Sequence, residues 1–188
     1  MHPLLRKLTG ADRRSIGKSN QVVAQVLKQP RLFRIVFNGM LDADPVLRMR
    51  CADSVEKITA QRPELLRPYK KQLIQRVAKA NQQEVRWHVA QMVARLALTP
   101  QERLAVVAIL REYLTDESSI VKTFSIQALA DIAAQDAALR PAIIKQLETL
   151  TRTGPPAMQA RGRKLLAKLK PNREKQCFTT SRNPSLIA

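Results

Sequence analysis

The sequence predicts an all-α protein built from repeated pairs of helices. Three observations favour this fold class: few strand-forming residues, an apolar pattern that recurs every 36 to 38 residues, and helix-starting residues at the joints of that repeat. Only 5 of the 188 residues are Gly and 4% are aromatic, whereas strands draw on aromatic residues and tight hairpins need Gly. A fixed period of this length is typical of helical-repeat arrays.

Each unit of the repeat begins at an apolar position, which we call the first core position. Its four members are Leu47, Val85, Val121 and Met158. Apolar or small residues follow 4, 7, 8 and 11 positions later in the units. At about 100° per residue, these positions all lie on one face of a helix. The pattern therefore predicts one helix with a buried stripe in each of four units.

A first helix is expected upstream of each of these second helices. One shared upstream position is apolar in every unit and is occupied by Val36, Ile74, Leu110 and Leu147. Another is proline in three units, at Pro30, Pro68 and Pro141. Because proline lacks a backbone donor, the first helices should start late or kink there. The predicted units cover about residues 30–61, 62–98, 99–136 and 137–170.

Turn chemistry at the joints agrees with this period. Thr99 is followed by Pro100 and, three positions on, by Glu102, which is the pattern of a capping box with proline in the first turn. Asp44 before a proline is a second N-cap candidate. Asn81 with Glu84 is a third. These residues predict where three of the helices begin.

The second helices carry a motif that resembles the HEAT-repeat family. The matching residues are Leu47-Arg48, Val85-Arg86 and Val121-Lys122, followed by Ser54-Val55, Met92-Val93 and Ala128-Leu129. The resemblance covers about residues 30–170 and is weaker in the fourth unit, where Gln159 replaces the basic residue and Gly162 interrupts the helix. It implies a right-handed α-solenoid, or α/α superhelix, of about four HEAT-like helix pairs. Second helices would line a concave surface that binds protein or nucleic acid, and no particular reaction is implied.

The two ends of the chain differ from the repeats. We expect residues 1–29 to form a polar lead and one capping helix over 21–28, because the end of a solenoid must cover its core. Residues 171–188 lack periodicity, and we expect a disordered basic tail. Cys51 and Cys177 are too far apart to suggest a disulfide framework or a metal site. No run of about 18 apolar residues is present, so we expect no membrane span. The cysteine pattern and the charged N-terminus predict a cytoplasmic protein, and we expect no metal and no cofactor.

The only Trp in the chain, Trp87, leads the candidate binding residues. It lies about 200° from the first core position, which places it toward the concave face. The expected partner-binding strip comprises Trp87, Met49, Arg50, His88, Gln91, Thr123, Phe124 and Gln127. Trp and Arg are the usual anchors of binding hot spots. Packing of Trp87 between adjacent repeats is the alternative interpretation.

A basic residue follows the first core position in three units, at Arg48, Arg86 and Lys122. This ladder is expected to pair with acids of neighbouring units, for which Asp44 and Asp116 are candidates. Gripping of an acidic partner is the alternative.

The formal charge of +18 makes nucleic acid a second class of partner. The candidate nucleic-acid contacts are Lys70, Lys71, Arg161, Arg163, Lys164 and Lys168. A solvated charged face is the alternative interpretation of these residues. Since no acid–base or nucleophile pair stands out, the sequence predicts a non-enzymatic module or scaffold that binds a protein. We expect a monomer, and an acidic protein is one candidate partner. The alternative is a nucleic-acid-binding protein that uses its basic surface and tails.

Overall fold

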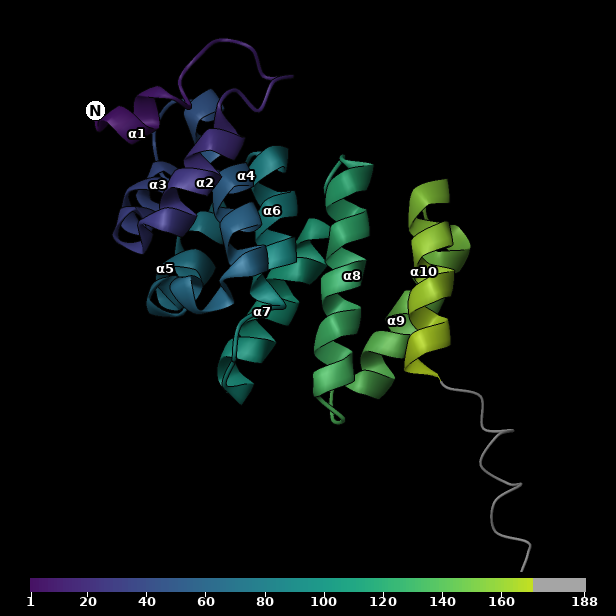
Figure 1. Cartoon of the computed structure of the whole chain (residues 1–188). Helices are drawn as coiled ribbons and strands as arrows, with labels where there is room; N and C mark the ends of the chain where they lie inside the picture. Colours follow the sequence, from purple (N-terminus) through teal and green to yellow (C-terminus); the bar gives the residue numbers. More distant parts are fainter. Residues whose placement is uncertain (171–188) are drawn as a thin grey trace, which may run out of the picture.

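The computed structural model describes residues 1–170 and is helical throughout that part of the chain (Figure 1). Among these described residues, α-helices and 3-10 segments together make up 75%, with ten α-helices and no strand. The prediction of an all-α protein is therefore confirmed. The expected basic tail, residues 171–188, lies outside the described residues.

The α-helices follow one another with short connections. They are α1 (Pro3–Arg6), α2 (Ser19–Lys28), α3 (Phe33–Gly39), α4 (Pro45–Gln61), α5 (Lys70–Gln75), α6 (Gln83–Val93), α7 (Pro100–Tyr113), α8 (Ser119–Gln135), α9 (Arg140–Thr153) and α10 (Pro156–Leu169). Three 3-10 segments accompany them: η1 (Pro30–Leu32), η2 (Pro63–Tyr69) and η3 (Val77–Lys79). Pro30 and Pro68 both lie in 3-10 segments, where the first helices of two predicted units were expected to be irregular.

The even-numbered helices from α2 to α10 form a row in which each packs against the next (Figure 1). We call this layer the even-helix row. The odd-numbered helices lie behind it: α3 packs on α4, α7 on α8, and α9 on α8 and α10. The hydrophobic core lies between the two layers.

The buried stripe that the period predicts is present in the even-helix row. All four residues at the first core position are buried: Leu47, Val85, Val121 and Met158. The later stripe positions are buried in α4, α6 and α8. In α10, Leu166 and Leu169 are only half-buried because this is the last helix of the described row. Burial thus confirms the predicted core positions.

Two of the three predicted helix starts form as expected. Thr99 and Glu102 make a capping box, in which each side chain accepts a hydrogen bond from the other's backbone N–H, at 3.3 and 2.8 Å. Asp44 caps α4 by accepting from the backbone of Val46 at 2.9 Å. The expectation at Asn81 was wrong, because α6 begins one residue later, with Gln82 at its N-cap and no side-chain cap.

Gly162 does not interrupt the last helix, contrary to the sequence expectation. α10 runs unbroken through it, and Gly162 is buried against α9. A Cβ atom at this position would overlap the Thr151 side chain. The glycine is therefore explained by the close approach of two helices rather than by a helix break.

Candidate functional site

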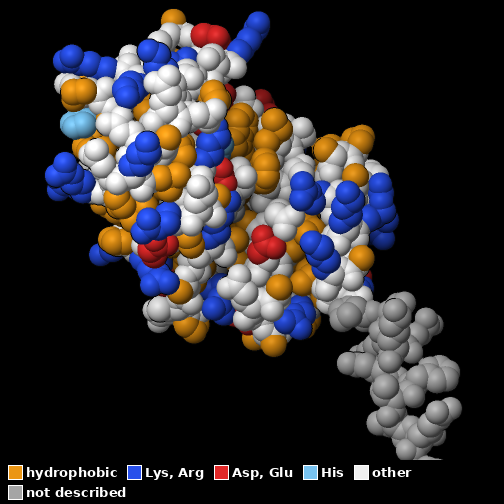
Figure 2. Space-filling view, in the orientation of Figure 1, with side chains coloured by type: hydrophobic (Ala, Val, Ile, Leu, Met, Phe, Trp, Pro, Cys, Tyr) orange, Lys and Arg blue, Asp and Glu red, His pale blue; other side chains and the backbone are white. Residues whose placement is uncertain are grey.

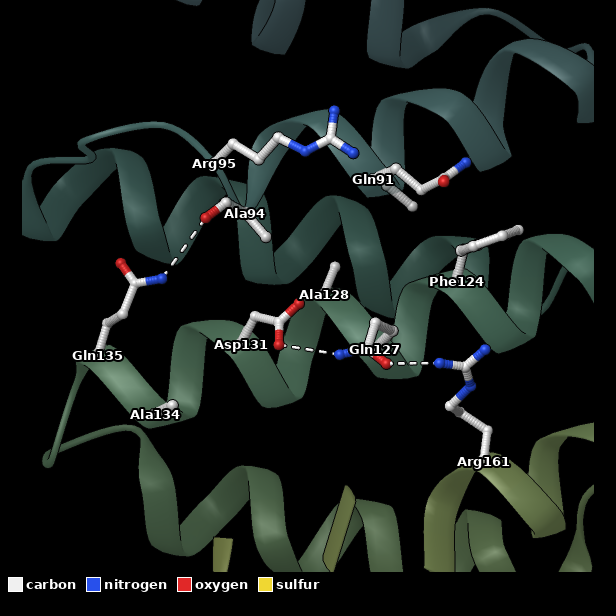
Figure 3. Close-up of a pocket in the computed structure, with 11 residues that line it drawn as sticks. Gln91, Ala94, Arg95, Phe124, Gln127, Ala128, Asp131, Ala134, Gln135 and Arg161 are labelled. Atoms are coloured by element: carbon white, nitrogen blue, oxygen red, sulfur yellow. Dashed lines mark hydrogen bonds between the residues drawn. The ribbon is translucent and has the colours of Figure 1, made fainter. Parts of the chain in front are cut away.

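A groove opens on the exposed face of the even-helix row, between α6, α8 and the start of α10 (Figure 3). We call it the central groove; its volume is about 490 Å³. Four alanines line it: Ala90, Ala94, Ala128 and Ala134. Because alanine side chains are short, they leave space between helices that pack closely elsewhere. The groove is thus a consequence of small residues on α6 and α8 and at the end of α6.

Polar and aromatic side chains stand around this alanine floor. The amides of Gln91, Gln127 and Gln135 line the groove together with the ring of Phe124. Arg95, in the turn after α6, and Arg161, on α10, lie at its two sides. The groove therefore combines apolar surface with hydrogen-bonding groups that match a peptide backbone, since an amide both donates and accepts.

Asp131 lies in the middle of the central groove, within a polar network (Figure 3). The Gln127 amide donates to its carboxylate at 2.9 Å, and Arg161 donates to the Gln127 amide oxygen at 3.0 Å. Burial raises the pKa of Asp131, while the Gln127 hydrogen bond and the charges of Lys168 and Arg161 oppose that rise. The network holds an acid where the protein is otherwise strongly basic.

Sequence reasoning missed Asp131 and Arg95, although a periodic signal marks them. The position ten residues after the first core position is charged in every unit: Lys57, Arg95, Asp131 and Lys168. It lies about 280° round the helix, beside the position of the two groove glutamines at about 240°. Both positions point away from the core stripe, so their shared polarity could have identified the exposed face.

The structure divides the expected partner-binding strip between two places. Gln91, Phe124 and Gln127 line the central groove. Met49 and Trp87 line a second cavity of about 330 Å³, between α4, α6 and residues 13–16, which we call the N-terminal cavity. Trp87 is half-buried, so it packs against the core and lines this cavity at once.

Arg50 was expected on the binding surface, but the structure buries it under the N-terminal segment. Its side chain is 4% exposed. The guanidinium donates to the backbone carbonyls of Leu8, Thr9, Asp12 and Ser15, at 2.7 to 3.1 Å. Arg50 is thus committed to holding residues 8–15 on α4 and is not available to a partner.

His88 occupies the equivalent position in α6 and is also covered, at 9% exposure. Burial lowers its pKa to about 4, although the charges of Asp53 and Glu56 act in the opposite direction. This position lies about 300° round the helix, near the edge of the core stripe, where neighbouring segments reach it. Arg50 and His88 therefore do not form an open strip, although His88 still lines the N-terminal cavity. Thr123 is half-buried, and its hydroxyl donates to the Ser119 carbonyl within α8 at 2.7 Å.

Two members of the basic ladder connect successive units. Arg86 donates to the Asp116 carboxylate at 2.8 Å. Arg48 donates to the Gln82 amide oxygen at 2.8 Å. Asp44, the other candidate acid, caps α4 and forms no ion pair among the described residues. Lys122 has no ion pair within residues 1–170.

The candidate nucleic-acid contacts lie on two separate parts of the molecule. Lys70 and Lys71 belong to α5 in the odd-numbered layer, and Lys70 pairs with Glu102 at 2.6 Å. The other four bases are on α10: Arg161, Arg163, Lys164 and Lys168. They are exposed, and α10 contains no acid. Figure 2 shows basic side chains gathered over this helix.

Metal-ligating side-chain types and a thiol are also present among the described residues. No group of three or more His, Cys, Asp or Glu side chains within residues 1–170 is arranged to hold a metal ion. The thiol of Cys51 is buried, and burial raises its pKa, with a smaller contribution from Asp42. Among helices α1 to α10, none has both the length and the apolar character needed to cross a membrane.

No protein-family model matches this chain, and no match is found among curated proteins or solved structures. The candidate site is therefore interpreted from its own geometry.

Proposed function

We propose that the chain is a non-catalytic protein-binding module, folded as a right-handed α-solenoid of about four HEAT-like helix pairs. The successive packing of the even-numbered helices and the repeated buried positions support this arrangement. In it, the even-helix row forms the concave surface, and the central groove lies on that surface. Helical-repeat proteins typically use such extended surfaces for binding.

The observation that carries the proposal is the composition of the central groove. Its alanine floor and Phe124 provide apolar surface, and its glutamines provide donors and acceptors. The Gln91 and Gln135 amides each donate within the protein, to the carbonyls of Trp87 and Ala94, and their oxygens face no donor among the described residues. An extended peptide segment supplies backbone N–H groups and side chains that match both kinds of surface.

Asp131 favours a polypeptide over a nucleic acid in this groove. A phosphate backbone would bring negative charge close to a half-buried carboxylate, and such like-charge contacts are unfavourable. A peptide that carries charges of both signs matches Asp131 at the centre and the exposed Arg161 at one side, whereas Arg95 is already paired with Glu56.

A groove-filling variant tests the proposal. Random peptides are selected by display on the full chain, and the affinities of the selected peptides are measured by titration. Ala94→Leu fills the groove from its half-buried side and should weaken binding by about tenfold or more. Ala105→Leu is the matched control, because Ala105 is exposed on α7 in the other layer. Failure to select any peptide, or equal affinities for the two variants, contradicts the proposal.

A second candidate function is nucleic-acid binding through α10. The observation that favours it is the set of four exposed bases on a helix without acids. Binding through phosphates releases counterions, so affinity for duplex or single-stranded DNA should fall steeply with salt. Lys164→Gln with Lys168→Gln should reduce the slope of log affinity against log salt by about 1 to 2. An unchanged slope excludes this helix as the contact surface.

A further inference from the structure

The N-terminal cavity is a second candidate binding site. It lies next to the central groove, and α6 lines both of them. Residues 13–16 form one side of it, and α4 and α6 form the other. The Arg50 hydrogen bonds to four carbonyls hold this segment in place. A cavity whose cover is fixed in this way is available to a ligand without a large ordering cost.

The walls of the N-terminal cavity are mostly apolar. Ile16 is 43% exposed over it, and Met49 and the half-buried Trp87 complete the apolar lining. The volume of about 330 Å³ is at the lower end of ligand pockets. These features suit one large, flat side chain, because aromatic rings gain from contact with an indole and a thioether.

Polar groups in the lining suit a ring with a polar tip. Asp53 lines the cavity and accepts hydrogen bonds from Ser19 and Lys57. His88 also lines it, and its Nδ1 atom has no hydrogen-bond partner among the described residues. The hydroxyl of an inserted ring could donate to the Asp53 carboxylate, which lines the cavity.

The rim of the cavity is basic. Arg13 and Arg14 are both exposed and form no ion pair within the described part of the chain. Of the two acids in the lining, Asp53 pairs with Lys57 at 2.9 Å, which leaves Glu84 opposite two arginines. The excess positive charge favours acidic groups beside the inserted ring.

Helix α6 contributes residues to both the cavity and the central groove. Trp87 and Gln91 are one helical turn apart and lie on the same face, and the Gln91 amide donates to the Trp87 carbonyl at 3.2 Å. Trp87 lines the cavity and Gln91 lines the groove. One extended segment is therefore able to contact both.

We infer that the N-terminal cavity anchors a tyrosine-type side chain from an acidic segment of the protein partner. This inference rests on the proposed function and specifies the chemistry of the partner. The ring would lie against Trp87 and Met49, its hydroxyl would reach the Asp53 and His88 side, and flanking acids would face Arg13 and Arg14.

The test uses the peptides selected by display on the full chain. Selected peptides should be enriched in an aromatic residue with Asp or Glu beside it. Replacing that aromatic residue by Ala should weaken binding by about tenfold or more, and replacing Tyr by Phe should weaken it less. Binding should change the fluorescence of Trp87, the single indole of the chain.

Two sets of variants separate this inference from the proposed function. The double variant Arg13→Glu with Arg14→Glu changes only exposed residues, and it should weaken the binding of acidic peptides by about tenfold. Arg31→Glu with Arg34→Glu is the matched control, at exposed positions on η1 and α3, and should leave affinity unchanged. Trp87→Ala should abolish the aromatic preference, with the melting curve of each variant recorded alongside.

Three results overturn the inference. The first is that Ala94→Leu weakens peptide binding, whereas Trp87→Ala and the Arg13→Glu with Arg14→Glu variant do not. The central groove would then be the binding site, and the N-terminal cavity would not anchor the peptide. Saturable quenching of Trp87 by adenosine monophosphate or single-stranded DNA, without competition from peptides, would assign the cavity to nucleotides. Failure to select any peptide would contradict both this inference and the proposed function.

Discussion

Arg86 in α6 donates to the carboxylate of Asp116, which lies 30 residues later in the turn before α8, at 2.8 Å. The same guanidinium donates to the Ala80 carbonyl at 3.1 Å and lies 5.3 Å from the centre of the Tyr113 ring. The Arg86 side chain thus connects the start of α6 to the turn between α7 and α8. Both charged side chains are mostly buried, at 15% and 11% exposure.

Replacing Arg86 by Ala should lower the free energy of unfolding by about 2 to 4 kcal/mol, because Asp116 would keep a largely buried, unpaired charge. Urea denaturation measures the effect. The matched control is Arg62→Ala, which breaks the Arg62–Glu64 pair at 45% and 42% exposure and should cost about 0 to 1 kcal/mol. Equal losses in the two variants would contradict a structural role for the Arg86 pair.

Gly162→Ala should destabilise the contact between α9 and α10. Alanine is the better helix former, so an effect of propensity alone would be stabilising. The added Cβ atom would instead overlap Thr151, and such overpacking typically costs about 1 to 3 kcal/mol. Thermal and urea unfolding measure the change. A second variant that adds Thr151→Ala should recover part of the loss, and a stabilised Gly162→Ala protein would refute the close-approach explanation.

Arg50→Gln should release the N-terminal segment from α4. The segment is held by hydrogen bonds from Arg50 to four carbonyls, and Gly17, just after it, adopts a φ of 57°, which favours glycine. Glutamine has fewer donors and cannot reach all four acceptors. Limited trypsin digestion, followed by mass spectrometry, should show faster cleavage after Arg13 and Arg14. The exposed Arg31→Gln variant should digest at these sites at the wild-type rate, and unchanged cleavage in Arg50→Gln would contradict the clamp.

His88 should make the protein less stable as the pH falls from 6.5 towards 4. Burial lowers its folded pKa to about 4 from an ordinary value of 6.5. The unfolded chain therefore takes up a proton first, and stability that is complete above pH 6.5 is lost as the pH falls through this window. The difference should amount to roughly 2 to 3 kcal/mol. His88→Gln should lack this component when unfolding is measured across the window, and parallel pH profiles for the two proteins would contradict it.

The periodic pattern of apolar residues predicted much of the fold, but it did not predict contacts between segments that are distant in the sequence. The spacing of apolar residues identified the buried stripe, because helical geometry fixes which positions share a face. It could not show that residues 8–15 fold back over Arg50, since backbone carbonyls leave no mark in the sequence. It also could not explain Gly162, whose role depends on Thr151 in a different helix. The sequence therefore predicted which face of a helix each residue occupies, but not which neighbouring element that residue contacts.

Asp131 offers the clearest separation of binding from stability. Burial raises the pKa of Asp131 in the folded protein. The folded protein therefore binds this proton more tightly than the unfolded chain does. The resulting stability is lost as the pH rises through the pKa of the folded state. Asp131→Asn should therefore melt at a higher temperature than the wild type at neutral pH, and the gap should close below the ordinary aspartate pKa of 3.8. The asparagine still accepts from Gln127, which preserves the local network. If the central groove binds a peptide that carries a basic residue opposite Asp131, the same variant should bind selected peptides more weakly despite its greater stability. Lower stability at neutral pH, or unchanged affinity for those peptides, would show that the carboxylate does not serve the groove.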